Sequence, residues 1–229
     1  MNFNVFKRAF YKTLPILAGY VVIGFGFGML LRQAGYGLVW ALAMSLFIYA
    51  GSMQYVGISL ISAPATLLTT LLTTLVVNAR HLFYSISMIK KYDKAGKFKP
   101  YLIFSLTDET YALIASDDSK QASDYLHFFI VSFLNHIYWI LGTIAGSMFA
   151  KAISFNVLGL EFSMTALFLA AFVDQWLDGK HRIVATLGIL LTLTSRLIFG
   201  TKVFLIPAMI AITIILVIFK DKLGEVSVK

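Results

Sequence analysis

The stretch Thr13–Leu31, TLPILAGYVVIGFGFGMLL, contains 19 consecutive uncharged residues. A helix of this length reaches about 28 Å, close to the thickness of a bilayer's hydrocarbon core. Lys7, Arg8 and Lys12 precede it, much as basic residues precede the apolar core of a signal peptide. No small-residue cleavage pattern follows, so we expect a retained transmembrane helix.

Further apolar runs fill the rest of the chain. They lie at about 38–62, 65–89, 101–116, 125–150, 162–177, 183–200 and 203–219. The 229 residues are 59% hydrophobic and only 13% charged, against about 25% charged in a typical soluble domain. Because the runs are continuous rather than alternating, a β-barrel is a poor alternative. We predict an all-α polytopic membrane protein, a single domain over 1–229 with about six full spans and two broken or re-entrant helices.

The net charge of +8 has an explanation that involves no nucleic acid. The basic residues lie between the apolar runs, where they set orientation by the positive-inside rule. The chain has no cysteine, and its His, Asp and Glu residues form no tight cluster in the sequence. We therefore expect no metal, no cofactor and no enzymatic activity. From the apolar runs we expect the protein to lie in the bacterial cytoplasmic membrane.

Charge placement predicts that one apolar run does not cross. The N-terminal basic residues and the loop Lys90–Lys99 are both expected in the cytoplasm, yet three runs lie between them. The run 38–62 contains the small, polar break Ala50–Gln54, AGSMQ. Two half-helices of about 12 residues would each reach about 18 Å, roughly half the bilayer. Either a re-entrant hairpin or a kinked span fits this pattern.

The hairpin leads to a complete topology. The run 101–116 then goes outward, 125–150 returns, 162–177 forms a second broken hairpin, and both termini are cytoplasmic. A weak internal repeat with halves 10–116 and 125–219 favours this arrangement, since it gives the halves opposite topology. The matching pairs include Gly24 with Gly142, Gly28 with Gly146, Gln54 with Gln175 and Arg80 with Arg196.

Charged residues inside apolar runs are costly and point to function. Arg80 lies about 15 Å along a helix from Lys90, and Asp108 and Glu109 lie about 12 Å along the next helix from Pro100. They therefore reach a similar depth from the same loop. One interpretation is a site for a zwitterion, with a carboxylate holding an ammonium group and Arg80 holding a carboxylate. The other is a structural ion pair. Asp108 or Glu109 could also carry a coupling proton.

Four more polar residues are candidates near this level. Asn78 and His81 share a helix face, and His81 could relay protons or simply pack. Ser52 and Gln54 at the break could donate to a substrate or satisfy freed backbone groups. Two further groups have a structural interpretation: Asn135 and His136 in interhelical hydrogen bonds, and Gly24, Gly26 and Gly28 in close helix packing.

Three polar stretches in this order resemble signatures of the AzlC family. They are Ala50–Tyr55 (AGSMQY), Asn78–Tyr84 (NARHLFY) and Thr107–Leu113 (TDETYAL), and the resemblance covers about residues 10–150. Tyr55 stands where the family pattern leads us to expect phenylalanine. The AzlC family comprises the large subunits of bacterial branched-chain amino acid exporters.

The resemblance implies a function that composition only makes plausible. It implies a secondary transporter that exports leucine, isoleucine, valine and in some cases methionine, driven by the proton gradient. It also implies a small AzlD-type membrane partner subunit. Two alternatives remain: a non-catalytic scaffold or channel-like membrane subunit, and a transporter of another small amphiphile or a cation.

Overall fold

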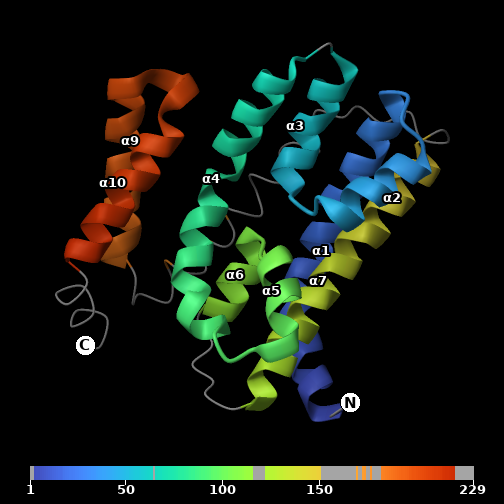
Figure 1. The fold of residues 1–229 in the computed structure, drawn as a ribbon, viewed down its shortest axis with the longest axis horizontal. Helices are drawn as coiled ribbons and strands as arrows, with labels where there is room; N and C mark the ends of the chain where they lie inside the picture. Colours follow the sequence, from blue (N-terminus) through green and yellow to red (C-terminus); the bar gives the residue numbers. More distant parts are fainter. Residues whose placement is uncertain are drawn as a thin grey trace. The chain divides into compact units, whose positions relative to one another are not determined.

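The computed structural model describes residues 3–63, 65–115, 122–150, 169, 172–173, 176 and 182–219. The chain divides into two compact units, Met1–Met164 and Thr165–Lys229, and each is described by itself. The elements of the first unit are α1 (Phe3–Gln33), α2 (Leu38–Phe47), α3 (Gly51–Ser62), α4 (Leu67–Tyr92), the 3-10 turn η1 (Gly96–Phe98), α5 (Lys99–Phe104), α6 (Asp108–Ala115) and α7 (Ala122–Phe149) (Figure 1).

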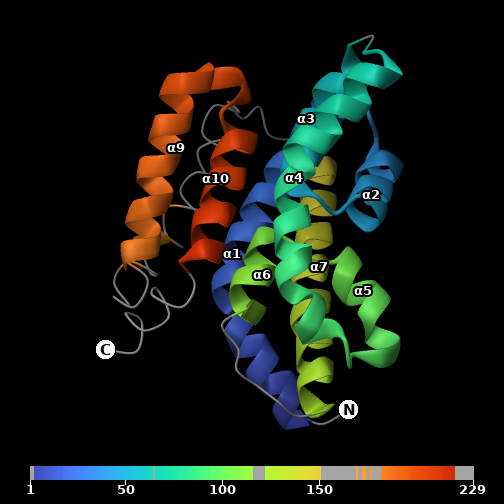
Figure 2. The ribbon, with the colours of Figure 1, turned by 60° about the vertical axis from the view of Figure 1, so that its left-hand side comes forward.

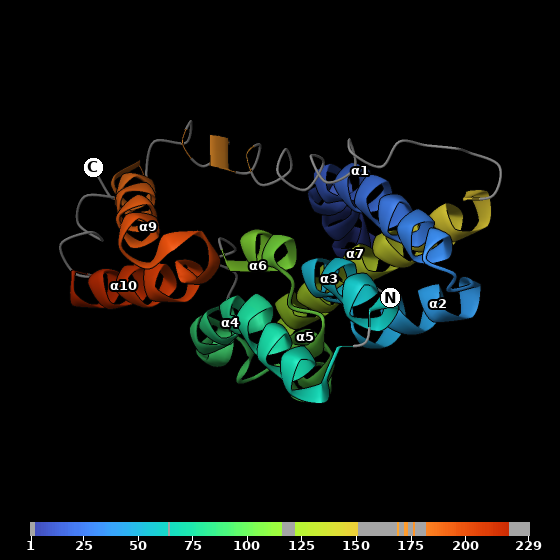
Figure 3. The ribbon, with the colours of Figure 1, turned by 90° about the horizontal axis from the view of Figure 1, so that it is seen from above.

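Helices α1 and α7 lie side by side and form the most extensive helix contact in the described part of the chain (Figures 1 and 3). Glycines make the close approach possible. A Cβ at Gly28 would lie 2.1 Å from the carbonyl oxygen of Thr143, and one at Gly146 would lie 1.9 Å from that of Phe25. Gly24 also meets this interface, facing Thr143. The predicted close-packing role of Gly24 and Gly28 is therefore confirmed.

The same contacts correct the predicted repeat. Gly24 faces Thr143 and Gly28 faces Ser147, so α1 and α7 run parallel. The expectation that Gly24 and Gly28 recur in a half of opposite topology is thus wrong for this helix pair. The matching glycines reflect one shared interface, because small residues are needed on both sides of a close contact. Most of the predicted hairpin at 162–177, including Asp174 and Gln175, lies outside the described residues.

Segment 38–62 forms a broken hairpin. Residues Ile48–Ala50 separate α2 from α3, and Tyr49 adopts a left-handed backbone conformation (φ 42°). The Tyr36 hydroxyl before α2 donates to the carbonyl oxygen of Ile61 near the end of α3, at 2.8 Å. Both ends of the segment therefore lie together (Figure 1). The re-entrant interpretation requires such a turn, whereas a kinked span would place the two ends of the segment at opposite ends of the unit.

Segment 99–115 forms a second hairpin, which the sequence did not lead us to expect. At the start of the segment, Lys99 Nζ lies 3.6 Å from Asp93 Oδ1. At its end, the carbonyl oxygen of Ile114 accepts a hydrogen bond from Lys91 Nζ at 2.5 Å. Both ends thus lie at the C-terminal end of α4 (Figure 2). The predicted outward span at 101–116 is wrong. Its apolar run is interrupted at Ser105–Thr107, where two short helices meet.

Three helix ends share one core cluster that fixes the direction of the long helices. Ala9 of α1, Tyr92 of α4 and Phe128 of α7 pack together. We call this end of the unit, which carries the loop Lys90–Lys99, the lysine end. The N-terminal basic residues lie at this end, as expected. Helix α7 also begins here, whereas the predicted topology placed its start on the opposite side.

The first unit therefore contains one pattern twice. A short helix, a break, a short helix and a long helix occur in α2–α3–α4 and again in α5–α6–α7. The first set enters from the end opposite the lysine end and the second from the lysine end, so the long helices α4 and α7 are antiparallel (Figures 1 and 2). This arrangement places the tips of both hairpins inside the unit.

Three described helices have the length and hydropathy of membrane spans: Phe3–Gln33, Tyr125–Phe149 and Arg182–Gly200. The 26 residues of α4 reach about 39 Å, enough to cross by length, but carry Asn78, Arg80 and His81 midway. The predicted six full spans are not established by these elements. In the second unit α9 (Arg182–Val203) and α10 (Leu205–Ile218) pack together, and Ser195 Oγ donates to the carbonyl oxygen of Phe204 at 2.8 Å.

Candidate functional site

Arg80 joins the tips of the two hairpins. One terminal nitrogen of its guanidinium donates to the Asp108 carboxylate on α6, and the other donates to Ser52 Oγ on α3. The ion pair is mostly shielded, with side-chain exposures of 21% for Arg80 and 14% for Asp108. Arg80 occupies the middle of α4, so the cluster lies at mid-height in the first unit. The predicted common depth of Arg80 and Asp108 is confirmed by this contact.

Two helix N-termini meet at this cluster. Ser52 lies in the first turn of α3, and Asp108 is the first residue of α6. Thr107 caps α6, since its Oγ1 accepts from the backbone N–H of Thr110 at 3.2 Å. Helix N-termini carry partial positive charge and favour anions. The site therefore combines a guanidinium with two positive helix ends. Among the described residues, Asp108 is the one carboxylate that forms a salt bridge with the guanidinium.

Glu109 has a different environment from its neighbour Asp108. The Tyr20 hydroxyl on α1 donates to Glu109 Oε2 at 2.7 Å, and the same hydroxyl lies 2.6 Å from Thr107 Oγ1. Among the described residues, no basic side chain forms a salt bridge with Glu109. Its negative charge is thus held by a neutral hydroxyl. It remains available for an ammonium group or a proton.

A chain of polar side chains connects this site to α7. Thr107 Oγ1 donates to Thr110 Oγ1 at 3.0 Å, and Asn135 Nδ2 donates to the same Thr110 oxygen at 3.0 Å. Thr110 and Asn135 are fully buried. Since side-chain hydrogen bonds between helices replace contacts with water, this chain holds α6 against α7. The predicted interhelical role of Asn135 is confirmed.

Several buried polar atoms around the hairpin tips have no hydrogen-bond partner in the part of the chain that the structure describes. They belong to Gln54 (both amide atoms), Asn78 Oδ1, Arg80 Nε, His81 Nδ1 and Asp108 Oδ1. Gln54 is fully buried in the first turn of α3. A buried polar group without a partner costs about 1–3 kcal/mol, so natural proteins seldom collect them without a reason. These atoms are suited to contacts with a polar ligand.

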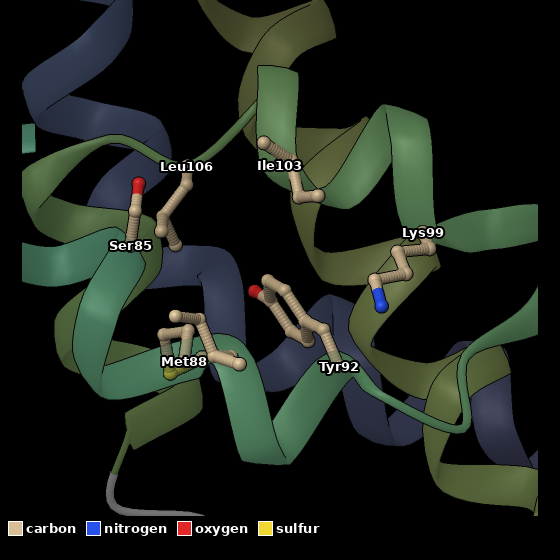
Figure 4. Close-up of a pocket in the computed structure, with 7 residues that line it drawn as sticks. Ser85, Met88, Tyr92, Lys99, Ile103 and Leu106 are labelled. Atoms are coloured by element: carbon tan, nitrogen blue, oxygen red, sulfur yellow. The ribbon is translucent and has the colours of Figure 1, made fainter. Parts of the chain in front are cut away.

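A small apolar pocket lies between α4 and α5, on the lysine side of the charged cluster (Figure 4). Its volume is about 170 Å³, and its walls include Met88, Ile89, Ile103 and Leu106. The Tyr92 hydroxyl points toward its middle, and Lys99 stands at its edge. Leu106 is the residue before Thr107, so the inner wall of the pocket is the break of the α5–α6 hairpin. Among the described residues, no group of three metal-ligating side chains is found.

The AzlC protein family model matches residues 15–153, more than half of the chain. The chain belongs to the AzlC family. A Bacillus subtilis (strain 168) protein named branched-chain amino acid transport protein AzlC is 39% identical over 226 residues, covering 97% of this chain and 89% of its own length. A membrane protein of Helicobacter pylori (strain ATCC 700392 / 26695) is 41% identical over 223 residues, covering 96% of this chain and 97% of its own.

Relatedness to the AzlC family extends beyond the stretch in which sequence motifs first indicated it. The inner membrane protein YgaZ of Escherichia coli (strain K12) is 25% identical over 208 residues, covering 86% of this chain and 84% of its own. The alignments with the Bacillus subtilis and Helicobacter pylori proteins cover 97% and 96% of the chain and therefore extend well beyond residue 150. No solved structure matches the chain.

The three AzlC-like stretches converge in space. The first contains the N-terminus of α3, the second the middle of α4 and the third the N-terminus of α6. They contribute Ser52, Arg80 and Asp108 to one hydrogen-bonded cluster. Glu109 follows Asp108 in the chain, but its side chain contacts Tyr20 on α1. Asn78 and His81 belong to the same turns of α4 as Arg80, and His81 makes a ring contact with Tyr84 at 6.0 Å.

One residue of the site in this AzlC-family chain, Tyr20, was not predicted from the sequence, and the role of another, His136, was predicted only in part. Tyr20 holds Glu109, and His136 bonds to both hairpins: its Nε2 is 2.9 Å from the Ser45 carbonyl oxygen and its Nδ1 is 3.0 Å from the Tyr101 hydroxyl. An interhelical hydrogen bond was expected of His136, but not a link between two broken helices. A tyrosine in an apolar run gives no signal of a carboxylate partner, because the partner is 89 residues away.

Proposed function

We propose that this chain is a secondary transporter that exports branched-chain amino acids (leucine, isoleucine, valine, and methionine as a further substrate) across the bacterial cytoplasmic membrane. The transport is coupled to protons and uses a small AzlD-type membrane partner subunit. The family membership and the printed name of the Bacillus subtilis relative support the substrate class.

The observation that carries the proposal is the position of Arg80 between two broken helices. Broken helices with N-termini directed at a mid-membrane site are the usual substrate-binding device of secondary transporters. Here Arg80 contacts Ser52 at one tip and Asp108 at the other. A substrate carboxylate that displaced Asp108 from the guanidinium would separate the tips. Such competition links binding to movement of the hairpins.

The carboxylate and the ammonium group of the zwitterion would bind to two protein groups of opposite charge. The guanidinium of Arg80 and the N-terminus of α3 would hold the substrate carboxylate. Glu109, which accepts a hydrogen bond from the Tyr20 hydroxyl and forms no salt bridge among the described residues, would hold the ammonium group. Gln54 and Asn78 supply unpartnered buried polar atoms on the adjacent turns. Within this site, His81, Asp108 and Glu109 are the candidates for a coupling proton.

The apolar pocket supports an aliphatic cargo. Its volume of about 170 Å³ accommodates a side chain of three or four carbons. A buried methylene group contributes about 0.8 kcal/mol, so such a pocket separates valine from smaller polar amino acids. Figure 4 shows Leu106 at the wall nearest the hairpin break.

One observation favours a different function. The Arg80 guanidinium already has two protein partners, which is what a structural ion pair in a scaffold or channel-like subunit would require. In that case the partner subunit would form the path. The two functions differ in what Arg80 and Glu109 do when cargo is present.

Efflux from dipeptide-fed cells distinguishes them. Cells supplied with a leucine-containing dipeptide and expressing the chain together with its AzlD-type subunit should release leucine faster than cells that express the subunit alone. Arg80→Ala and Glu109→Gln should abolish this release at normal membrane abundance. Normal leucine release by both variants would contradict the zwitterion site. A panel of alanine, lysine and choline as competitors would reveal a different amphiphile or a cation as cargo.

A further inference from the structure

His136 lies at a point where both hairpins meet α7. Its Nε2 is 2.9 Å from the carbonyl oxygen of Ser45 in the last turn of α2, and its Nδ1 is 3.0 Å from the hydroxyl of Tyr101 on α5. The ring stacks on that of Tyr49 in the α2–α3 break, with centroids 4.1 Å apart. His136 is 7% exposed. One imidazole thus bonds to one helix of each hairpin.

These partners determine which nitrogen carries the proton. A carbonyl oxygen only accepts, so Nε2 must donate to Ser45. In neutral imidazole the other nitrogen is then an acceptor, and the Tyr101 hydroxyl donates to it. The neutral ring therefore satisfies both hairpins at once. A carbonyl at a helix C-terminus also favours a nearby positive charge, so α2 can tolerate protonation of the ring.

Protonation changes only one of the two links. A proton added at Nδ1 turns this nitrogen into a donor, and the Tyr101 O–H can no longer donate to it. The hydroxyl must accept instead, and its hydrogen needs a new acceptor in a buried place. The bond to Ser45 is unaffected. Binding of one proton therefore weakens the hydrogen bond between His136 and Tyr101 of α5 and keeps the one between His136 and Ser45 of α2.

The groups that face His136 from the packed elements are few. The titratable ones are Tyr49 from the α2–α3 break and Tyr101 from α5. Phe104 of α5 is the other ring in contact, at 5.9 Å. Among the described residues, His136 forms no ion pair.

We propose that His136 binds the coupling proton and thereby controls whether the two hairpins are linked. The proposal rests on the transport function above and identifies a proton site separate from Asp108, Glu109 and His81. A proton taken up at Nδ1 on one side of the membrane is released from the same atom after the hairpins have moved. No other group changes its charge in this step.

The test separates coupling from transport. Membrane vesicles from cells expressing the full-length chain together with its AzlD-type subunit are used to measure two rates: leucine accumulation driven by an imposed pH gradient, and leucine counterflow into leucine-loaded vesicles without a gradient. His136→Gln retains a donor for Ser45 and an acceptor for Tyr101 but does not titrate. We expect it to lose gradient-driven accumulation and to keep counterflow, which becomes independent of pH. His127→Gln on the same helix should keep both.

Gradient-driven accumulation at the wild-type rate in His136→Gln would overturn the proposal. If that variant loses counterflow as well, Tyr101→Phe decides, because it removes only the bond that protonation changes. A shifted pH midpoint of counterflow in Tyr101→Phe supports the proton site, and an unchanged midpoint overturns it. An absence of leucine counterflow in wild-type vesicles is a different result, which refutes the proposed function itself.

Discussion

The guanidinium of Arg80 in the middle of α4 is paired with the carboxylate of Asp108, the first residue of α6. The two residues are 28 positions apart and approach from a long helix and from a hairpin tip. A partly buried charge pair of this kind holds the tip in place, and it also leaves a charged group unpaired when either partner is removed.

Exchange of the two charges separates structure from binding. Arg80→Asp alone and Asp108→Arg alone should each lower stability, because each juxtaposes like charges and loses a charged hydrogen bond worth about 1.5–3 kcal/mol. The double variant restores opposite charges and should recover thermal stability in detergent. It should not recover leucine efflux, since the carboxylate-binding group has moved.

Recovery of both properties in the double variant would mean that the pair is only structural. Lys99→Ala provides the stability control. Its ion pair with Asp93 is exposed, with side-chain exposures of 41% and 70%, and such pairs contribute little.

A filled pocket should change the choice of cargo. Ser85 lines the pocket between α4 and α5, and Ser85→Leu adds carbon atoms to a volume of about 170 Å³. We expect leucine efflux to fall more than valine efflux, because the smaller side chain still fits. Ser87→Leu, two positions away and exposed, is the matched control. An equal fall for leucine and valine would place the aliphatic side chain elsewhere.

The parallel contact of α1 and α7 should tolerate no side chain at its glycines. In Gly146→Ala the new Cβ would lie 1.9 Å from the carbonyl oxygen of Phe25, so the helices must separate. Overpacking of this kind costs about 1–3 kcal/mol. Melting in detergent should therefore occur several degrees lower. Gly188→Ala on α9, where no atom lies within 4 Å of the new Cβ, should melt like the wild type.

Cysteine labelling tests the second hairpin directly, since the chain contains no cysteine. Single cysteines at Lys94 and Ala115 should react with a membrane-impermeant reagent from the same side, because both lie at the lysine end. A cysteine at Ala34, after α1, should react from the other side. If Ala115→Cys reacted from the same side as Ala34→Cys, segment 101–116 would cross the membrane and the hairpin would be wrong.

The sequence predicted the first hairpin, 38–62, but not the second, 99–115. The run 38–62 is too short for two full spans, and the charge rule required one run to turn back. The predicted break at Ala50–Gln54 lies next to the observed one at Ile48–Ala50. In 101–116 the run has the length of a short span, and Ser105 and Thr107 are compatible with a helix interior. The break becomes evident only through hydrogen bonds, such as the one from Lys91 to the end of α6.

The sequence by itself determined the class of protein and the chemistry of its centre. Hydropathy requires lipid as the solvent for most of the chain, and the cost of charge in lipid made Arg80, Asp108 and Glu109 conspicuous before any partner was known. Family membership followed from the same polar stretches. These properties are local, because each depends on a residue type and its neighbours along one run.

Tertiary structure alone decided which elements share the centre. Three relations join residues far apart in the chain. Helices α1 and α7 run parallel, segment 99–115 returns to the lysine end, and His136 bonds to both hairpins. Hydropathy cannot encode them, because it is nearly the same for a helix that crosses and a hairpin that returns. The choice is made by contacts: glycine backbones that permit close approach, and polar side chains that find their only partners across the fold.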